Sequence, residues 1–272
     1  MCTQFIFDFK SLTITTSNAD QPIKLYIKGK VMPKALKIED ELRTQVGSLR
    51  LKYRSLNLGK VKTADEPAMK KFDVYNDSDK EIVFSDQMQS PDHISVSFEP
   101  AVLASKARGN LVITYDAKGR NDLGFMNDNV TFYTNEQGED SIKSISVYAT
   151  IEEFFPPMTK EEFDKAPRLS IEEAVYDFGK IKQDNVVSTE FTLKNNGQSK
   201  LNIRKAIGNC SCTVANLKKE NIKPGESVTM KVTFDPKGRK GNQQKSVTIY
   251  SNDPKASAQR VTIKAYISTG SL

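Results

Sequence analysis

The feature that most constrains the fold of this chain is that its sequence repeats itself. Segment 49–84 resembles segment 167–203, because both contain an alternating run, a Gly-Lys turn, a polar stretch and a second alternating run that ends in a polar turn. Segment 110–151 resembles 227–267, since each has a Val/Thr/Ile run, an Asp-x-Lys-Gly-Arg turn and two further alternating runs. Self-similarity of this kind indicates two copies of one structural module.

Each copy has the pattern of a β-sandwich. About seven short runs follow one another at intervals of roughly 8–12 residues, which is typical of immunoglobulin-like domains. In the run SVTIYS, alternation places Val247 and Ile249 on one face of a strand. An apolar fraction of 38% and a mean hydropathy of −0.51 suit small sandwiches that keep one face of each strand polar. The sequence therefore predicts an all-β protein of tandem immunoglobulin-like sandwiches, with short helical turns in the joints between them.

These repeats divide the chain into modules. Residues 47–152 form the first complete module and residues 167–268 the second. Residues 1–32 reproduce only the closing hairpin of a module, since 10–31 resembles the last two runs of the second copy. Two strands alone are at best marginally stable in water. We therefore expect residues 5–31 to be completed by a preceding portion, to pack on the next module, or to pair with another chain by strand-mediated self-association.

Helical signals are confined to the joints, residues 33–46 and 153–166. In the second joint Thr159 is placed as an N-cap, Glu162 is in capping-box register, and Pro167 would stop a helix. In the first joint, one or two helical turns are expected. Both joints are short and charged, so we expect semi-ordered connectors between the modules.

The reactive residues argue against an enzyme. Three cysteines cannot build a disulfide framework, so the modules must be stabilised by packed cores. The single histidine, His93, has only Asp92 beside it, and we interpret it as a surface or turn residue without a catalytic partner. The sequence has no glycine-rich phosphate loop. We therefore expect no enzymatic activity and no cofactor.

Two further features bear on location. No apolar run approaches the roughly 18 residues that a membrane-spanning helix needs, so we expect no transmembrane segment. The first ten residues, MCTQFIFDFK, lack the basic start, the apolar stretch and the small-residue cleavage site of a signal peptide. These observations alone do not assign a compartment.

The pair Cys210-x-Cys212 is the one constellation with reactive potential. Two thiols at this spacing can clamp a soft ion such as Cu(I) or Zn(II), or take part in redox exchange. Zinc would need further ligands, and no nearby His or Cys supplies them. A disulfide between the two would close a very small ring and be strained. The alternative, which we favour, is that both are small apolar side chains at the edge of the sandwich core.

Charge is distributed unevenly along the chain. Residues 46–152 carry 13 basic and 16 acidic side chains, a net charge of −3, whereas residues 165–267 carry 19 and 9, a net charge of +10. The basic excess suggests a patch for an anionic partner such as a polysaccharide or a phospholipid headgroup. The alternatives are solvated loops, or an attraction that fixes the angle between the modules. Without aromatic residues on these loops, we do not expect nucleic-acid binding. The candidate patch comprises Arg204, Lys205, Lys218, Lys219, Lys237, Arg239 and Lys240.

Five phrases follow one another in the second complete module: DFGKIKQ (177–183), FTLKNNGQSKLNI (191–203), NCSCTV (209–214), IKPGESVTMKVTFDPKGRKG (222–241) and TIYSNDP (248–254). Together they resemble domain-of-unknown-function family 1573, whose immunoglobulin-like modules are common in Bacteroidetes envelope proteins and have no established activity. The resemblance implies a periplasmic or cell-surface location. The modules also look like distant relatives of the PapD-chaperone and major-sperm-protein sandwiches, which hold other proteins. The first complete module departs from the family pattern, because Pro91–Val96 stands where the second has Cys-Ser-Cys-Thr-Val.

The sequence thus predicts a non-catalytic cell-envelope protein whose tandem modules act as a spacer and as an interaction surface for a protein or an anionic glycan. The competing hypothesis is a metal-handling or thiol-redox module that uses Cys210 and Cys212. The two hypotheses differ in one measurable property, the reactivity of these two thiols.

Overall fold

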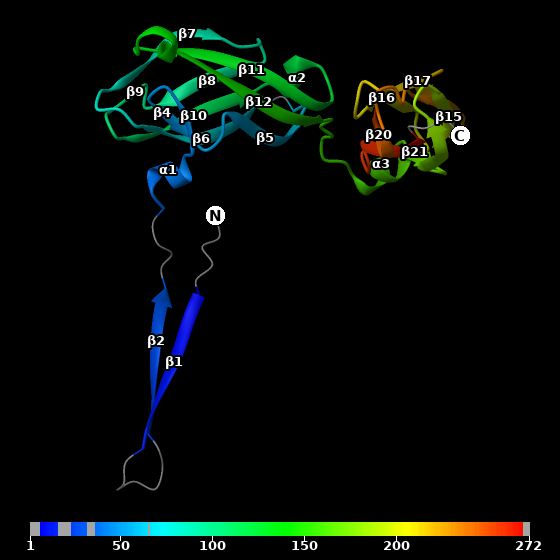
Figure 1. The fold of residues 1–272 in the computed structure, drawn as a ribbon. Coiled ribbons are helices and arrows are strands. Elements are labelled where there is room, and N and C mark those ends of the chain that lie inside the picture. The colour runs from blue at the N-terminus through cyan, green and yellow to red at the C-terminus, as the bar shows by residue number, and fades with distance from the viewer. Residues whose placement is uncertain (1–5, 16–22, 32–35, 65, 269–272) are drawn as a thin grey trace.

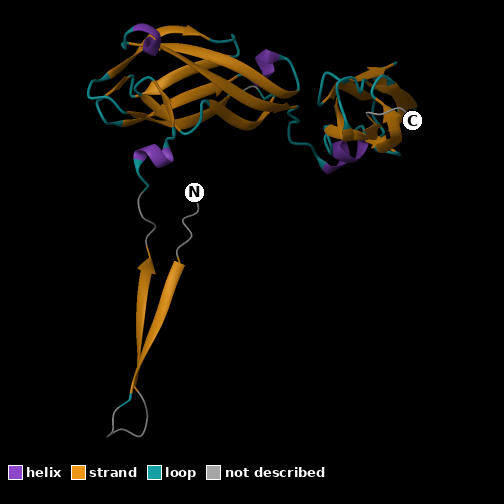
Figure 2. Cartoon of the chain, viewed as in Figure 1, coloured by secondary structure: helices purple, strands orange, loops and turns teal. Residues whose placement is uncertain are grey.

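The computed structural model describes residues 6–15, 23–31, 36–64 and 66–268. It contains two β-sandwiches linked by a short helical segment, and a two-stranded hairpin precedes them in the chain (Figure 1). Strands make up nearly all of the regular structure, and the helices are short (Figure 2). The predicted all-β fold of tandem immunoglobulin-like sandwiches is confirmed.

The first sandwich consists of two five-stranded sheets, with the orders β3-β4-β6-β10-β8 and β5-β12-β11-β7-β9. Its strands are β3 Thr44–Val46, β4 Leu49–Leu51, β5 Ser55–Lys62, β6 Ala68–Asn76, β7 Ile82–Gln89, β8 Ile94–Glu99, β9 Val102–Leu103, β10 Arg108–Tyr115, β11 Gly124–Thr134 and β12 Ile142–Glu152. Neighbouring strands are antiparallel except for β5, which runs parallel to β12. This pairing joins the beginning of the module to its end.

The second sandwich repeats this plan, with sheets in the orders β13-β15-β19-β17 and β14-β21-β20-β16-β18. Its strands are β13 Leu169–Ile171, β14 Val175–Lys182, β15 Val187–Asn195, β16 Leu201–Gly208, β17 Thr213–Leu217, β18 Asn221–Ile222, β19 Ser227–Phe234, β20 Gly241–Ser251 and β21 Ala258–Ser268. Each has a counterpart at the same place in the first sandwich, and β14 again runs parallel to β21.

One strand of the first sandwich, β3, has no counterpart in the second. It pairs with β4 across the turn at Gly47 and extends that sheet by one strand. The first sandwich therefore begins at Thr44, inside the segment 33–46 that the sequence predicts to be a joint. The reason is the positive φ of Gly47, 61°, which permits a tight reversal directly after the short first helix.

Both cores are built from alternating residues. On β11, Val130 and Phe132 point inward and are 0% exposed, whereas Phe125 on the other face is 67% exposed. On β20, Val247 and Ile249 are both buried, as their alternation predicts. Full burial of a large apolar side chain stabilises a fold by roughly 1.5–3 kcal/mol. Packed cores therefore provide the stability that three cysteines could not.

A buried asparagine ends the second long strand of each sandwich. Asn195 Nδ2 donates to the carbonyl oxygens of Ser199 and Ile222 at 2.8 and 3.0 Å, and Asn195 Oδ1 accepts from the Gly197 N–H at 2.9 Å. Asn76 makes the corresponding bonds in the first sandwich. Both asparagines are 0% exposed. One amide thus pairs backbone groups that would otherwise be buried without partners.

Replacing this amide should destabilise the second sandwich. We expect Asn195→Ala to lower the free energy of unfolding by about 3 kcal/mol, because several buried hydrogen bonds are lost at once. The matched control is Asn196→Ala, since Asn196 is exposed and should change stability by less than about 0.5 kcal/mol. Urea unfolding of the full chain measures both. Equal midpoints for the two variants would contradict the assigned role of Asn195.

Four short helices are present in the described residues: α1 Ile38–Glu41, α2 Ala117–Arg120, the 3-10 helix η1 Gly138–Ser141 and α3 Lys160–Lys165. In the joint before the second sandwich, Thr159 Oγ1 accepts from the Glu162 N–H at 3.3 Å, and the Glu162 carboxylate accepts from the Thr159 N–H at 2.8 Å. The predicted capping box is confirmed. No helix in the described ranges is long and apolar enough to cross a membrane.

The N-terminal strands β1 Ile6–Ile14 and β2 Ile23–Val31 form an antiparallel hairpin. Within the described residues they pair only with each other. Apolar side chains of the hairpin are exposed, Leu12 by 56% and Tyr26 by 69%. Parts of the predicted hairpin module 1–32 lie outside the described residues: 1–5, 16–22 and 32. Strand-mediated self-association through this hairpin stays a prediction.

Candidate functional site

The two sandwiches are joined by ion pairs as well as by the chain. Arg204 on β16 donates from Nε and Nη2 to the two carboxylate oxygens of Glu153, at 3.1 and 2.9 Å. Lys205 donates from Nζ to Asp122 Oδ1 at 2.6 Å and to the Leu123 carbonyl at 3.4 Å. A bidentate arginine–carboxylate pair fixes orientation as well as distance. The sequence allowed three roles for the basic residues: binding an anionic partner, solvated loops, or attraction between the modules. For Arg204 and Lys205, the structure shows attraction between the modules.

A tyrosine is buried at the same contact. Tyr250 points outward from β20, yet it is only 8% exposed, because it lies against Gly124 of the first sandwich. Gly124 has a φ of +100°, and a Cβ there would lie 3.0 Å from Tyr250 Oη. Burial raises the pKa of the Tyr250 phenol. We refer to the following residues as the inter-module joint: Asp122, Leu123, Gly124, Glu153, Arg204, Lys205 and Tyr250.

A two-residue insertion in the first sandwich supplies residues by which it contacts the second sandwich. The turn after β10 reads Asp-Ala-Lys-Gly-Arg-Asn-Asp-Leu-Gly (116–124), whereas its counterpart after β19 reads Asp-Pro-Lys-Gly-Arg-Lys-Gly (235–241). The inserted residues are Asp122 and Leu123, which Lys205 contacts. This surface was not predicted from the sequence. The signal that could have revealed it was the difference in turn length between the two repeats.

The seven residues of the candidate anionic patch do not form one surface. Arg204 and Lys205 are engaged in the joint. Lys218 and Lys219 lie in the turn between β17 and β18, where Lys219 pairs with Glu226 at 2.5 Å. The remaining members lie in the turn between β19 and β20, at the other end of the sandwich: Lys237, Arg239 and Lys240. Binding of an anionic partner stays a prediction for that last turn.

His93 belongs to a polar cluster, and of the two alternatives predicted for it, a surface or a turn residue, the structure shows the turn. It lies in the turn before β8, as expected, but its side chain is only 14% exposed. Arg120 Nη1 lies 2.6 Å from His93 Nε2 and 2.5 Å from Asp128 Oδ1. Tyr115 donates its hydroxyl to Asp128 Oδ2 at 3.1 Å, and burial, followed by the charge of Asp128, raises the pKa of Tyr115. The cluster therefore ties the β7–β8 turn to β10, α2 and β11.

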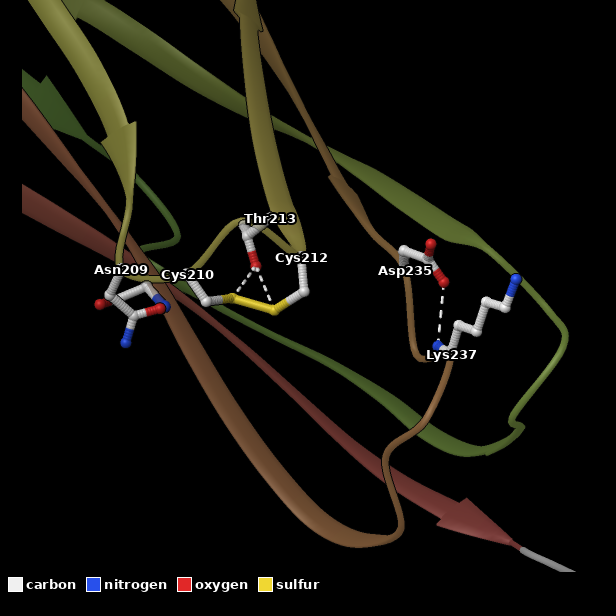
Figure 3. Close-up of a disulfide and its surroundings, with 7 residues drawn as sticks. Asn209, Cys210, Cys212, Thr213, Asp235 and Lys237 are labelled. Atoms are coloured by element: carbon white, nitrogen blue, oxygen red, sulfur yellow. Dashed lines mark hydrogen bonds between the residues drawn. A yellow bond between two sulfur atoms is a disulfide. The ribbon is translucent and has the colours of Figure 1, made fainter.

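The corresponding turn of the second sandwich holds a disulfide between Cys210 and Cys212, with Cα atoms 5.2 Å apart (Figure 3). The hydroxyl of Thr213, the first residue of β17, lies 3.4 Å from Cys210 Sγ and 3.7 Å from Cys212 Sγ. Thr213 is 4% exposed, whereas both cysteines are partly exposed. The Asp235 N–H donates to the Cys212 carbonyl at 2.9 Å, which holds this turn beside the β19–β20 turn.

The disulfide corrects the interpretation of the two cysteines as free apolar side chains. Cys212 packs against the second core, but Cys210 is not among the described side chains that do so. The two residues are separated by 2 in sequence, so the closed loop has only three residues. Loop-closure entropy then gives a stabilisation of about 1.6 kcal/mol, roughly half of the value for a 15-residue loop. The bond is therefore a weak structural crosslink.

The disulfide also bears on the predicted metal role of Cys210 and Cys212. Neither sulfur of a disulfide is a thiolate, so this form offers no ligand to a soft metal ion. Within the described residues, no three side chains of His, Cys, Asp or Glu are placed to hold a metal ion together. Metal binding by the reduced pair stays a prediction.

Two immunoglobulin-like sandwiches with the same strand order define a tandem-module protein. The chain belongs to the family described as Protein of unknown function (DUF1573), which matches residues 49–150 and 169–267, one match in each sandwich. The family resemblance inferred from the five sequence segments of the second module is confirmed. The chain has no significant match among curated proteins.

Among solved structures, the chain is similar to a protein of unknown function from Porphyromonas gingivalis W83, with 17% identity and a TM-score of 0.55 over 81% of this chain and 100% of that one. It is more distantly similar to the PapD-like domain 7 of human CEP192, with 11% identity and a TM-score of 0.33 over 43% of this chain and 95% of that one. The periplasmic chaperone SfaE gives 11% identity and a TM-score of 0.29 over 81% of this chain and 100% of that one.

The joint can be tested through the titration of Tyr250. We expect Gly124→Val to expose the phenol, so that its pKa falls toward the ordinary value of about 10. Spectrophotometric titration measures the pKa, and Tyr250→Phe identifies the signal. The matched control is Gly241→Val, because Gly241 also has a positive φ but has no atom within 4 Å of an added Cβ. An unchanged Tyr250 pKa in Gly124→Val would show that the two sandwiches do not meet there.

Proposed function

We propose that this chain is a non-catalytic cell-envelope protein whose two sandwiches are held at a fixed spacing and present an interaction surface to a partner. The observation that carries the proposal is the inter-module joint. Three contacts converge there: the Arg204–Glu153 pair, the Lys205–Asp122 pair, and Tyr250 buried against Gly124. A short connection with additional contacts of this kind restrains the relative motion that tandem domains otherwise have.

Each contact of the joint is individually modest. Arg204 is 43% exposed and Lys205 30%, and exposed ion pairs contribute about 0–1 kcal/mol each. Their combination is more specific, since a bidentate arginine, a lysine and an aromatic ring must all fit in one orientation. A fixed orientation is the property that a spacer requires.

The location in the cell envelope is supported by the Cys210–Cys212 bond. Disulfides persist in oxidising compartments such as the periplasm and the cell surface, and are rare in the cytosol. The non-catalytic part of the proposal is supported by the state of His93. Its Nε2 already contacts Arg120 and Asp128, so that nitrogen is engaged within the cluster.

The spacer role predicts a narrow distribution of distances between the sandwiches. Spin labels at Asp73→Cys and Glu190→Cys, both exposed positions, in a Cys2→Ser background report that distribution by pulsed electron resonance. We expect one narrow distance in the parent protein and a broad distribution after Arg204→Glu with Lys205→Glu, because both ion pairs become repulsive. The control is Lys218→Glu with Lys219→Glu, which makes the same charge change away from the joint. A broad distribution in the parent protein would refute the spacer function.

An anionic glycan partner would meet the turn between β19 and β20. We expect heparin, used as the probe polyanion, to bind with an affinity that falls with salt and drops about tenfold in Lys237→Glu with Lys240→Glu. The same charge reversal at Lys218 and Lys219 is the control. Binding that is absent, independent of salt, or equally weakened by both pairs would remove this turn as the glycan surface.

A further inference from the structure

We propose that the Cys210–Cys212 disulfide is a thiol–disulfide exchange site that forms a mixed disulfide with a cysteine thiol of a partner polypeptide. The proposal rests on the turn between β16 and β17 and does not depend on the inter-module joint. It adds a covalent step to a protein that is otherwise proposed to act by contact alone.

The position of the bond suits exchange better than structural support. A three-residue loop restricts the unfolded chain little, and the two sulfurs lie in a partly exposed turn. The same turn of the first sandwich forms without cysteines, because Pro91, Asp92 and His93 occupy it. The sandwich fold therefore does not require this bond. Access to a sulfur is what exchange requires.

The geometry of the turn distinguishes the two sulfurs. Cys212 packs against the second core, whereas Cys210 is not one of the described side chains packed there. An incoming thiolate must approach along the S–S axis from the side opposite the leaving sulfur. Attack at Cys210 Sγ leaves Cys212, the sulfur on the core side, as the departing thiolate.

Thr213 is placed to stabilise that thiolate. The sulfurs of a disulfide carry no hydrogen, so the hydroxyl of Thr213 is the donor in its contacts at 3.4 and 3.7 Å. Thr213 is 4% exposed, and its N–H donates to the Cys210 carbonyl at 3.2 Å. This hydrogen bond holds Thr213 beside the disulfide. A hydroxyl that donates to a thiolate lowers the pKa of the thiol and makes it a better leaving group. In the first sandwich, Ile94 takes the register position of Thr213 and offers no donor.

The neighbouring turn favours the approach of an anion. It contains Lys237, Arg239 and Lys240 against one acidic residue, Asp235. The hydrogen bond from the Asp235 N–H to the Cys212 carbonyl keeps the two turns together, as Figure 3 shows for the side-by-side loops. This net charge acts on an approaching thiolate at long range, because Figure 3 shows the Lys237 side chain extending away from the two sulfurs.

The reaction balances without a cofactor. A partner thiolate, RS⁻, forms a bond to Cys210 Sγ while the Cys210–Cys212 bond breaks, and the electron pair of that bond goes to Cys212 Sγ. A second thiol of the same partner then attacks the partner sulfur of the mixed disulfide and releases Cys210. The partner dithiol is oxidised to a disulfide, and the pair Cys210 and Cys212 is reduced to two thiols.

The test uses the full chain with Cys2→Ser, so that Cys210 and Cys212 supply all thiols. We expect reduced glutathione to open the bond in the folded protein, and oxidised glutathione to convert the free Cys210 thiol of the Cys212→Ser variant into a mixed disulfide that mass spectrometry detects. In the reduced protein, the thiolate absorbance at 240 nm should titrate at a lower pH than in Thr213→Val, by about one pKa unit. Thr213→Ser should restore the lower value, because it keeps the hydroxyl.

The control is Thr233→Val, a threonine on the partner strand β19 whose register partner is Val214. It should leave both the rate of opening and the thiol titration unchanged. A disulfide that glutathione opens only when the protein is thermally unfolded would overturn the proposal. Equal titration curves for the parent protein and Thr213→Val would also refute the role given to Thr213. Neither outcome affects the distance measurement that tests the spacer function.

Discussion

Each sandwich depends on the side chain of one buried asparagine, and in the second sandwich this dependence extends to the joint. Asn195 holds the carbonyl of Ile222, and Ile222 on the short strand β18 pairs with Leu201 at the start of β16. The register of β16 then places Arg204 and Lys205 three and four residues further along. An uncharged amide in the core of the module thus positions the two cations that meet the other module. Because a buried amide is costly unless fully paired, this arrangement also disfavours alternative registers.

The joint makes the contact between the two modules specific to one end of the first module. Both modules share one plan, but only the first has the two inserted residues, Asp122 and Leu123, in the turn that faces its neighbour. The corresponding turn of the second module carries Lys240 before Gly241, so the charge at the equivalent end is reversed. A difference of two residues, together with the charge asymmetry between the modules, determines which end of one sandwich meets which face of the other.

Much of the fold followed from the sequence because it depends on local pattern. Alternation placed Val247 and Ile249 in the core, and the spacing of Thr159 and Glu162 gave the capping box. The polar features were less predictable, because they depend on the register between distant strands. Arg120 meets His93 across 27 residues, and Lys205 meets Asp122 across 83. Ring size alone disfavoured the disulfide between Cys210 and Cys212, which the structure forms within a turn.

The turn before β8 in the first module corresponds to the turn before β17 in the second, and the residues around these two turns differ together. Where the first sandwich has Ile94, Tyr115 and Asp128, the register positions of the second hold Thr213, Phe234 and Lys245. The first set closes a cluster that ties the turn to the body of the sandwich through Arg120 and His93. The second set cannot form that cluster, because the phenol and the carboxylate are both gone. Its turn is held instead by backbone hydrogen bonds and by a covalent bond within the turn itself. Opening that bond would therefore alter the turn without breaking a contact on which the core depends. A reversible exchange site on a rigid module requires this.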